Sequence, residues 1–97
     1  MHQEKSLASS AEAEIIALKV LGFLASEPER LSRFMDLTGL GPQAIRASAA
    51  EPAFLGGLMD HLLADETLLL IFCEEHDLEP ERIQLLRRKL PGAALDL

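Results

Sequence analysis

The sequence predicts an all-α protein, a compact bundle of about six short helices. Apolar residues recur at helical spacing through most of the 97 residues, and proline, glycine or capping side chains separate these stretches. The core must be mainly aliphatic, because the chain has four Phe but no Tyr or Trp. Such a core suits helix-on-helix packing, and the chain is long enough to bury it without a disulfide or a metal.

The expected domain organisation is simple. Residues 1–8 should form a flexible N-terminal tail, residues 9–92 a single all-helical domain, and residues 93–97 a C-terminal tail. The first helix should begin after Ser9, which has with Glu12 the spacing of a capping box. Apolar side chains leave this helix only a narrow polar edge, which includes Lys19. We therefore expect it to be nearly surrounded by protein.

The second helix should begin near Pro28, since proline is tolerated in a first helical turn. Ser26 and Glu29 again have capping-box spacing there. Gly39 stands where a helix is commonly ended by a residue in the left-handed conformation. These residues predict a helix of about three turns between two short connections.

Prolines also open three of the remaining helices. Pro42 begins a short third helix anchored by Ile45, and Pro52 begins the fourth, which reaches Leu63. Pro80 begins the sixth, PERIQLLRRKL, which the following Pro-Gly pair should end.

The fifth helix contains the run Leu68–Cys73, which alone could also be a buried strand. Acidic residues flank the run on both sides, and no second strand candidate exists to pair with it. We therefore predict a helix that Asp65 caps and that extends to about His76.

The chain contains a candidate internal duplication. A shift of 38 residues places identical residues on one another: Leu31 on Leu69, Phe34 on Phe72, Leu40 on Leu78, Pro42 on Pro80, and Ile45 on Ile83. The second copy has Asp77 in place of Gly39, a weaker choice for a left-handed helix end. Two interpretations stay open: two repeated halves of three helices each, or coincidence, because helical corners reuse few residue types.

The charge balance disfavours several classes of function. A net charge of −7 opposes non-specific binding to phosphate backbones. Cys73 is the only cysteine, so the chain forms no internal disulfide and fits a reducing compartment. The N-terminal residues lack an apolar signal core, and no apolar run approaches the roughly 20 residues that span a bilayer. We expect a cytoplasmic protein without membrane contact.

Nucleic-acid binding is the alternative function that the sequence raises. The corner FMDLTGLGPQAIR has the outline of a helix-turn-helix, but its second helix offers only Arg46 as a base. The sixth helix is the better candidate because four basic residues gather there: Arg82, Arg87, Arg88 and Lys89. They could equally complement the helix dipole or pair with the acidic surface. We therefore expect no nucleic-acid partner.

Two spacings could support chemistry. Cys73 and His76 lie three residues apart on one helix, but a structural zinc needs four ligands, and a buried cysteine is the simpler interpretation. His61 and Asp65 could hold an oriented imidazole, with Asp60 adding negative charge, yet no nucleophile motif accompanies them. We expect no catalytic, cofactor-binding or metal-ligating residue, no cofactor, and no enzymatic activity.

Gly56 and Gly57 lie inside the fourth helix, where each costs about 0.5–1 kcal/mol relative to alanine. We expect another helix to cross closely there, with the first helix at Gly22 as the partner. The alternative is a shallow groove for the side chain of another protein.

Three blocks of the sequence resemble a known family: FLASEPERLSRF, TGLGPQAIR and PAFLGGLMDHLLADETLLLIF. Together they are similar to domain of unknown function 3572, a small group mainly from alphaproteobacteria. The resemblance covers residues 20–90, and the chain departs from it at Gly56-Gly57 and at Asp77. It implies an all-helical fold and no established activity. The sequence alone therefore favours a non-enzymatic protein-interaction module, with a protein partner or a homo-oligomer.

Overall fold

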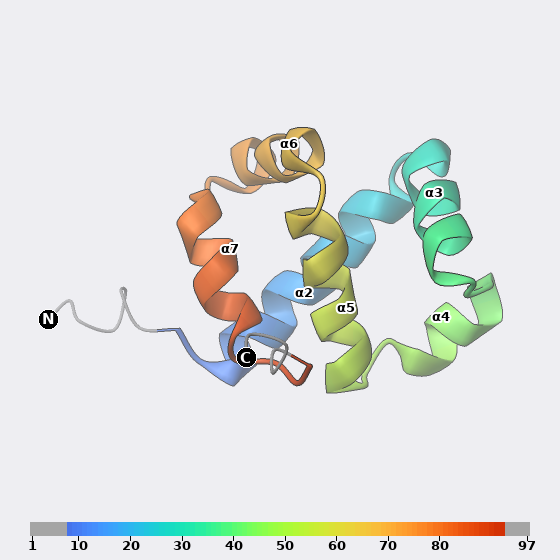
Figure 1. Cartoon of the computed structure of the whole chain (residues 1–97), viewed down its shortest axis with the longest axis horizontal. Helices are drawn as coiled ribbons and strands as arrows, with labels where there is room; N and C mark the ends of the chain where they lie inside the picture. The colour runs from blue at the N-terminus through green and yellow to red at the C-terminus, as the bar shows by residue number, and fades with distance from the viewer. Residues whose placement is uncertain (1–7, 93–97) are drawn as a thin grey trace, which may run out of the picture.

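The computed structural model describes residues 8–92 and confirms the all-α prediction. The described part contains six helices and no strand (Figure 1): α2 (Ser10–Ala25), α3 (Pro28–Thr38), α4 (Pro42–Ser48), α5 (Pro52–Leu63), α6 (Glu66–His76) and α7 (Pro80–Arg87). Apart from Ala8, the tails expected at residues 1–8 and 93–97 lie outside the described residues. Each helix of residues 8–92 is too short or too polar to cross a lipid bilayer.

Helices α2 and α5 cross at the centre of the molecule and pack directly on one another (Figure 1). Helices α6 and α7 lie on one side of this crossing, and α3 and α4 lie on the other. Helix α7 packs against α2, α5 and α6, whereas α4 makes only minor contacts and buries one residue, Ile45. The core therefore lies around the two crossed helices, and α4 is the helix most weakly attached to it.

The helix starts follow the sequence with one exception. Ser9 accepts a hydrogen bond from the Glu12 amide, and Asp65 caps α6 in the same way, so both predicted caps are confirmed. The cap predicted at Ser26 is wrong. Its hydroxyl instead donates to the Phe23 carbonyl at 2.7 Å, and Glu27 precedes α3 without a side-chain cap. Ser26 therefore ends α2 rather than beginning α3.

Helix α7 is shorter than the sequence predicts and ends at Arg87. The amides of residues 88, 89 and 90 donate to carbonyls three residues earlier, those of Leu85, Leu86 and Arg87. This tighter pattern closes the helix in a turn before Pro91 is reached. The Pro-Gly pair thus follows the helix end instead of causing it.

The structure repeats itself with the 38-residue shift found in the sequence. Helices α3 and α6 have the same length, and the shift carries both ends of α3 onto those of α6. Gly39 and Asp77 both adopt the left-handed conformation, with φ of 78° and 56°. Their amides donate to equivalent carbonyls, those of Met35 and Cys73. These shared details support the duplication rather than coincidence.

The two halves also interlock through equivalent ring contacts. Phe23 of α2 meets Phe72 of α6 edge to face, with ring centroids 5.3 Å apart. The shift relates this pair to His61 of α5 and Phe34 of α3, which meet edge to face at 5.0 Å. One ring contact thus links the long helix of each half to the middle helix of the other half.

Candidate functional site

Cys73 and His76 lie on α6, and each has its own contacts within the protein. The His76 ring stacks on Phe72, and its Nδ1 lies 3.1 Å from the carbonyl oxygen of that residue. Cys73 is buried, and burial, together with the charges of Glu79 and Glu81, raises the pKa of its thiol. Among residues 8–92 no group of three or more His, Cys, Asp or Glu side chains is arranged to hold a metal.

The imidazole of His61 is half-buried against the ring of Phe34. Burial and the positive charge of Arg33 lower its pKa, and the charge of Asp65 opposes them only in part. Asp65 therefore acts on His61 through its charge, while its Oδ1 accepts the hydrogen bond that caps α6. His61 occupies a packing position in the structure.

The four basic residues of the C-terminal region do not form one basic surface. Arg82 donates to Glu12 of α2, with its Nη2 2.6 Å from Oε1. Arg87 is only 7% exposed, and Arg88 and Lys89 remain exposed. Two of the four basic residues are therefore paired with carboxylates of other helices, and Arg88 and Lys89 are the two that remain exposed.

Arg87 forms a buried clamp on α5. Its Nε lies 2.6 Å from Oδ1 of Asp60 and its Nη2 3.0 Å from Oδ2, while Nη1 donates to the carbonyls of Leu90 and Pro91, each at 3.0 Å. A buried guanidinium needs such partners, because an unpaired buried charge is strongly destabilising. The clamp therefore fixes the turn after α7 on the surface of α5.

The clamp explains why a glycine, with no side chain, occupies position 56. A Cβ at this position would lie 2.8 Å from the Pro91 carbonyl oxygen and 3.0 Å from Nη1 of Arg87. The prediction that a helix, α2 at Gly22, crosses closely at these glycines is wrong, because the close neighbours of Gly56 are the turn after α7 and the Arg87 side chain. A Cβ at Gly22 or Gly57 would have no neighbour within 4 Å, because α2 packs on another face of α5.

The outer face of α2 is apolar and uncovered. One sector of the helix, which we call the outer stripe, carries five exposed apolar residues: Ala11, Ile15, Leu18, Gly22 and Ala25. Ile15 is 55% exposed and Leu18 is 46% exposed. The core residues of α2 lie on the opposite sector: Ala13, Ile16, Ala17, Val20, Phe23 and Leu24. The prediction that protein nearly surrounds this helix is therefore wrong for the described part of the chain.

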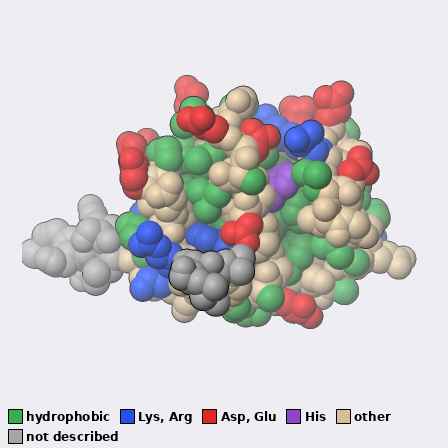
Figure 2. Space-filling model, in the orientation of Figure 1, with side chains coloured by type: hydrophobic (Ala, Val, Ile, Leu, Met, Phe, Trp, Pro, Cys, Tyr) green, Lys and Arg blue, Asp and Glu red, His purple; other side chains and the backbone are tan. Residues whose placement is uncertain are grey.

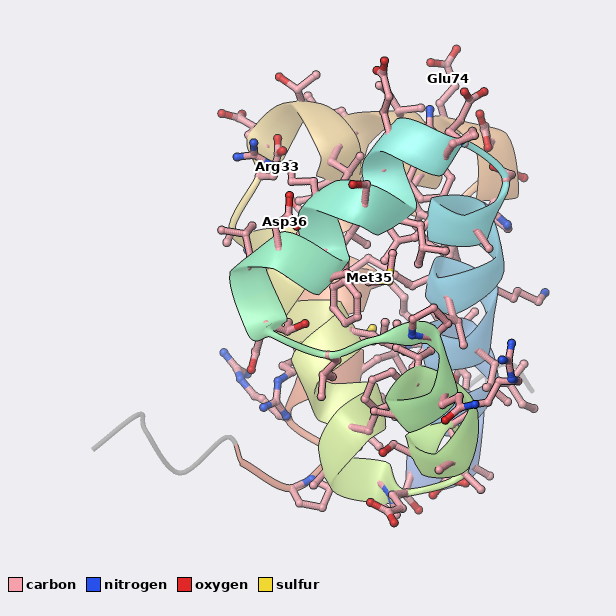
Figure 3. All side chains as sticks on the ribbon, turned by 90° about the vertical axis from the view of Figure 1, so that its right-hand side faces the viewer. Arg33, Met35, Asp36 and Glu74 are labelled. Atoms are coloured by element: carbon pink, nitrogen blue, oxygen red, sulfur yellow. The ribbon has the colours of Figure 1, made fainter. Side chains whose placement is uncertain are left out.

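Figures 2 and 3 locate this face. In Figure 3, α2 runs along the right-hand edge of the molecule, and no other helix lies outside it. Figure 2 shows the opposite side, on which α5 lies in front in Figure 1, and there acidic and basic side chains are scattered among the hydrophobic ones. The outer stripe thus forms the back of the molecule as Figure 1 is drawn.

The duplication shows how the equivalent face of α5 is covered. The 38-residue shift relates Leu18 to Gly56 and Gly22 to Asp60, the two positions on which the Arg87 clamp sits. The residue equivalent to Arg87 is Ala49, which has no guanidinium. After α4 the chain also continues directly into α5 instead of folding back over α2. The turn after α7 thus buries Gly56 on α5, whereas the equivalent residue of α2, Leu18, is exposed.

The signal for the outer stripe was present in the sequence. Its residues follow one another at steps of four, three, four and three, the spacing that lines one face of a helix. From the sequence alone, Ile15 is expected to face protein, as is nearly the whole of this helix. Periodicity cannot distinguish an apolar face that meets the core from one that meets another molecule.

The comparisons with known proteins give a family but no relative of established function. No curated protein and no solved structure matches the chain. Residues 10–93 match the family described as protein of unknown function (DUF3572). Because this match spans most of the chain and the whole helical bundle, the protein belongs to the DUF3572 family.

Proposed function

We propose that this protein is a non-enzymatic protein-interaction module that binds another protein helix along the outer stripe of α2. The observation that carries the proposal is the exposure of Ile15 and Leu18 on a helix whose other face is core. Large aliphatic side chains in a continuous exposed row are typical of interaction surfaces. The spacing of the row fits a helical partner, because two packed helices contact each other through apolar residues three and four positions apart.

The rest of the α2 surface supports the same proposal. The stripe is about 21 Å long, at 1.5 Å per residue between Ala11 and Ala25. Gly22 has open space around its Cα, so the backbone of a partner helix can approach closely there. Exposed apolar residues elsewhere, such as Leu37 of α3 and Leu70 of α6, lie on other helices and do not extend this row.

A pair of matched substitutions tests the proposal. Leu18→Asp places a charge in the stripe, and Leu37→Asp makes the same change at another exposed leucine. We expect that association of the full chain, with itself or with a protein retained from cell lysate, survives Leu37→Asp and is lost with Leu18→Asp. Light scattering after size exclusion and affinity capture measure the two cases. A wild-type chain that associates with nothing, or whose associations ignore Leu18→Asp, would refute the proposal.

A further inference from the structure

We infer that the occupant of the outer stripe is a second copy of this chain, with the two α2 helices side by side and parallel. This inference rests on the proposed function and goes further by naming the partner and its orientation. The steps of the stripe correspond to a and d positions of a coiled coil, with Ile15 and Gly22 at a. Leu18 then stands at d, between Ala11 and Ala25 at the neighbouring d positions.

The residue types at these positions favour two parallel strands. A β-branched residue at a combined with leucine at d is the combination that favours parallel dimers, and Ile15 with Leu18 has this arrangement. Gly22 adds space for close approach of the two backbones at the next a position. The stripe thus matches itself when a second α2 is placed against it in the same direction.

The charges beside the stripe select the same orientation. Glu14 stands at g and Lys19 at e, on opposite sides of the stripe and five residues apart. Within residues 8–92 neither side chain forms an ion pair. Across a parallel interface, the g position of one helix faces the e position five residues later on the other helix. Glu14 of each chain therefore faces Lys19 of the other chain, and the two-fold symmetry gives two such contacts. An antiparallel interface would instead place g positions opposite g and e positions opposite e, so Glu14 of one chain would not face Lys19 of the other.

The dimer should be weak. The stripe contains three small residues among five and covers about two heptads, so it buries less than the roughly 1,200–2,000 Å² of stable complexes. Its dissociation constant should be on the order of 10–100 µM. Sedimentation of the full chain from about 1 µM to about 1 mM should show a reversible monomer–dimer equilibrium. Leu18→Asp should abolish dimerisation, and Leu37→Asp should leave it unchanged, with both variants helical by circular dichroism.

Charge reversal tests the paired contacts. Glu14→Lys alone and Lys19→Glu alone should each weaken the dimer about tenfold, because two attractive contacts become repulsive. The double variant should restore the wild-type dissociation constant. A mixture of the two single variants should form a heterodimer tighter than either homodimer, because both contacts between the chains are then attractive. If neither reversal changes the dissociation constant, these two residues do not face each other and the parallel arrangement is wrong.

Crosslinking tests the orientation directly. In a parallel dimer, Ala11→Cys should form a disulfide with its own copy under mild oxidation, and so should Ala25→Cys. Cys73 is buried and should not interfere. Crosslinks that form only when the two variants are mixed would show an antiparallel pair and overturn the inference. A wild-type chain that stays monomeric at about 1 mM would also overturn it. If that monomer still captures a protein in a Leu18-dependent way, the proposed function stands without the dimer.

Discussion

Arg87 and Asp60 form a two-point ion pair between α7 and α5, with N–O distances of 2.6 and 3.0 Å. The guanidinium is almost fully buried, whereas the side chain of Asp60 is 56% exposed. The third nitrogen of Arg87 holds the carbonyls of Leu90 and Pro91, so a single side chain joins α5 to the turn after α7. This asymmetry of burial determines what each substitution should do.

Removing the guanidinium should be the more damaging change. Arg87→Met keeps the buried aliphatic stem but leaves the two carbonyls without a donor, so the free energy of unfolding should fall by about 2–3 kcal/mol. Asp60→Asn should cost only about 1 kcal/mol, because water can replace a carboxylate that is half exposed. Urea unfolding measures both. Arg88→Met, at an exposed neighbouring residue, is the control and should change stability by less than about 0.5 kcal/mol. Equal effects at Arg87 and Arg88 would contradict the clamp.

The adjacent glycines should respond in opposite directions. Gly57→Ala should stabilise the protein by about 0.5–1 kcal/mol, because the added methyl group meets nothing and the helix is favoured. Gly56→Ala should destabilise it by about 1–2 kcal/mol, because the methyl group would press on the Pro91 carbonyl and on Arg87. Thermal unfolding compares the two directly. A gain of stability at both positions would mean that the turn after α7 moves away without cost.

The two left-handed helix ends offer a second matched pair. Asp77→Gly should stabilise the protein by about 0.5–1 kcal/mol, because φ of 56° is unfavourable for a residue with a Cβ. Gly39→Ala should destabilise it by about 1 kcal/mol for the same reason. Both are measured by chemical unfolding. A loss of stability in Asp77→Gly would show that the carboxylate makes a contribution larger than the backbone strain.

Acid should destabilise the protein through His61. Burial and Arg33 lower the pKa of this imidazole in the folded state from its ordinary 6.5. The unfolded chain therefore binds the proton more readily, and stability that is complete above about pH 6.5 is lost as the pH falls through the lower folded pKa. Stability measured between about pH 7 and about pH 5 should show this loss.

A substitution at the same position identifies the group responsible. His61→Phe should flatten the pH dependence attributed to this residue and keep the ring contact with Phe34, because its equivalent in the first half, Phe23, makes the same contact with Phe72. Arg33→Gln should raise the pKa of His61, measured by its proton resonance during titration. An unchanged pH dependence in His61→Phe would assign the acid sensitivity to another group.

Local residue chemistry explains how much of the fold could be predicted. Ser9 and Asp65 cap amides three residues away, and each helix-opening proline has a fixed φ and no N–H to leave unpaired in a first turn. Their positions alone therefore predict where helices begin. Gly39 likewise predicts its own left-handed conformation. The wrong prediction at Ser26 also has a local cause. The Ser26 hydroxyl could bond to the end of α2 or to the start of α3, and in the structure it donates to the Phe23 carbonyl of α2.

The candidate site could be predicted only in part. The sequence identifies which residues of α2 are apolar. Whether a given face of the helix is buried depends on which segments, distant in the sequence, pack against it. Arg87 and Asp60 are 27 residues apart in the sequence, and no local sequence pattern predicts their contact. For the same reason the sequence predicted a helix crossing at Gly56, where the structure instead places the turn after α7.

The sequence by itself thus determined the six helices and most of their starts and suggested the 38-residue repeat, because these depend on spacing and on hydrogen bonds between near neighbours. Only the tertiary structure decided that the repeated halves differ in what covers their long helices. The turn after α7 folds back and clamps α5, while the chain after α4 passes directly into α5 and leaves the equivalent face of α2 open. The path of the chain after α4 and after α7 decides which face is covered, and helical periodicity contains no information about that path.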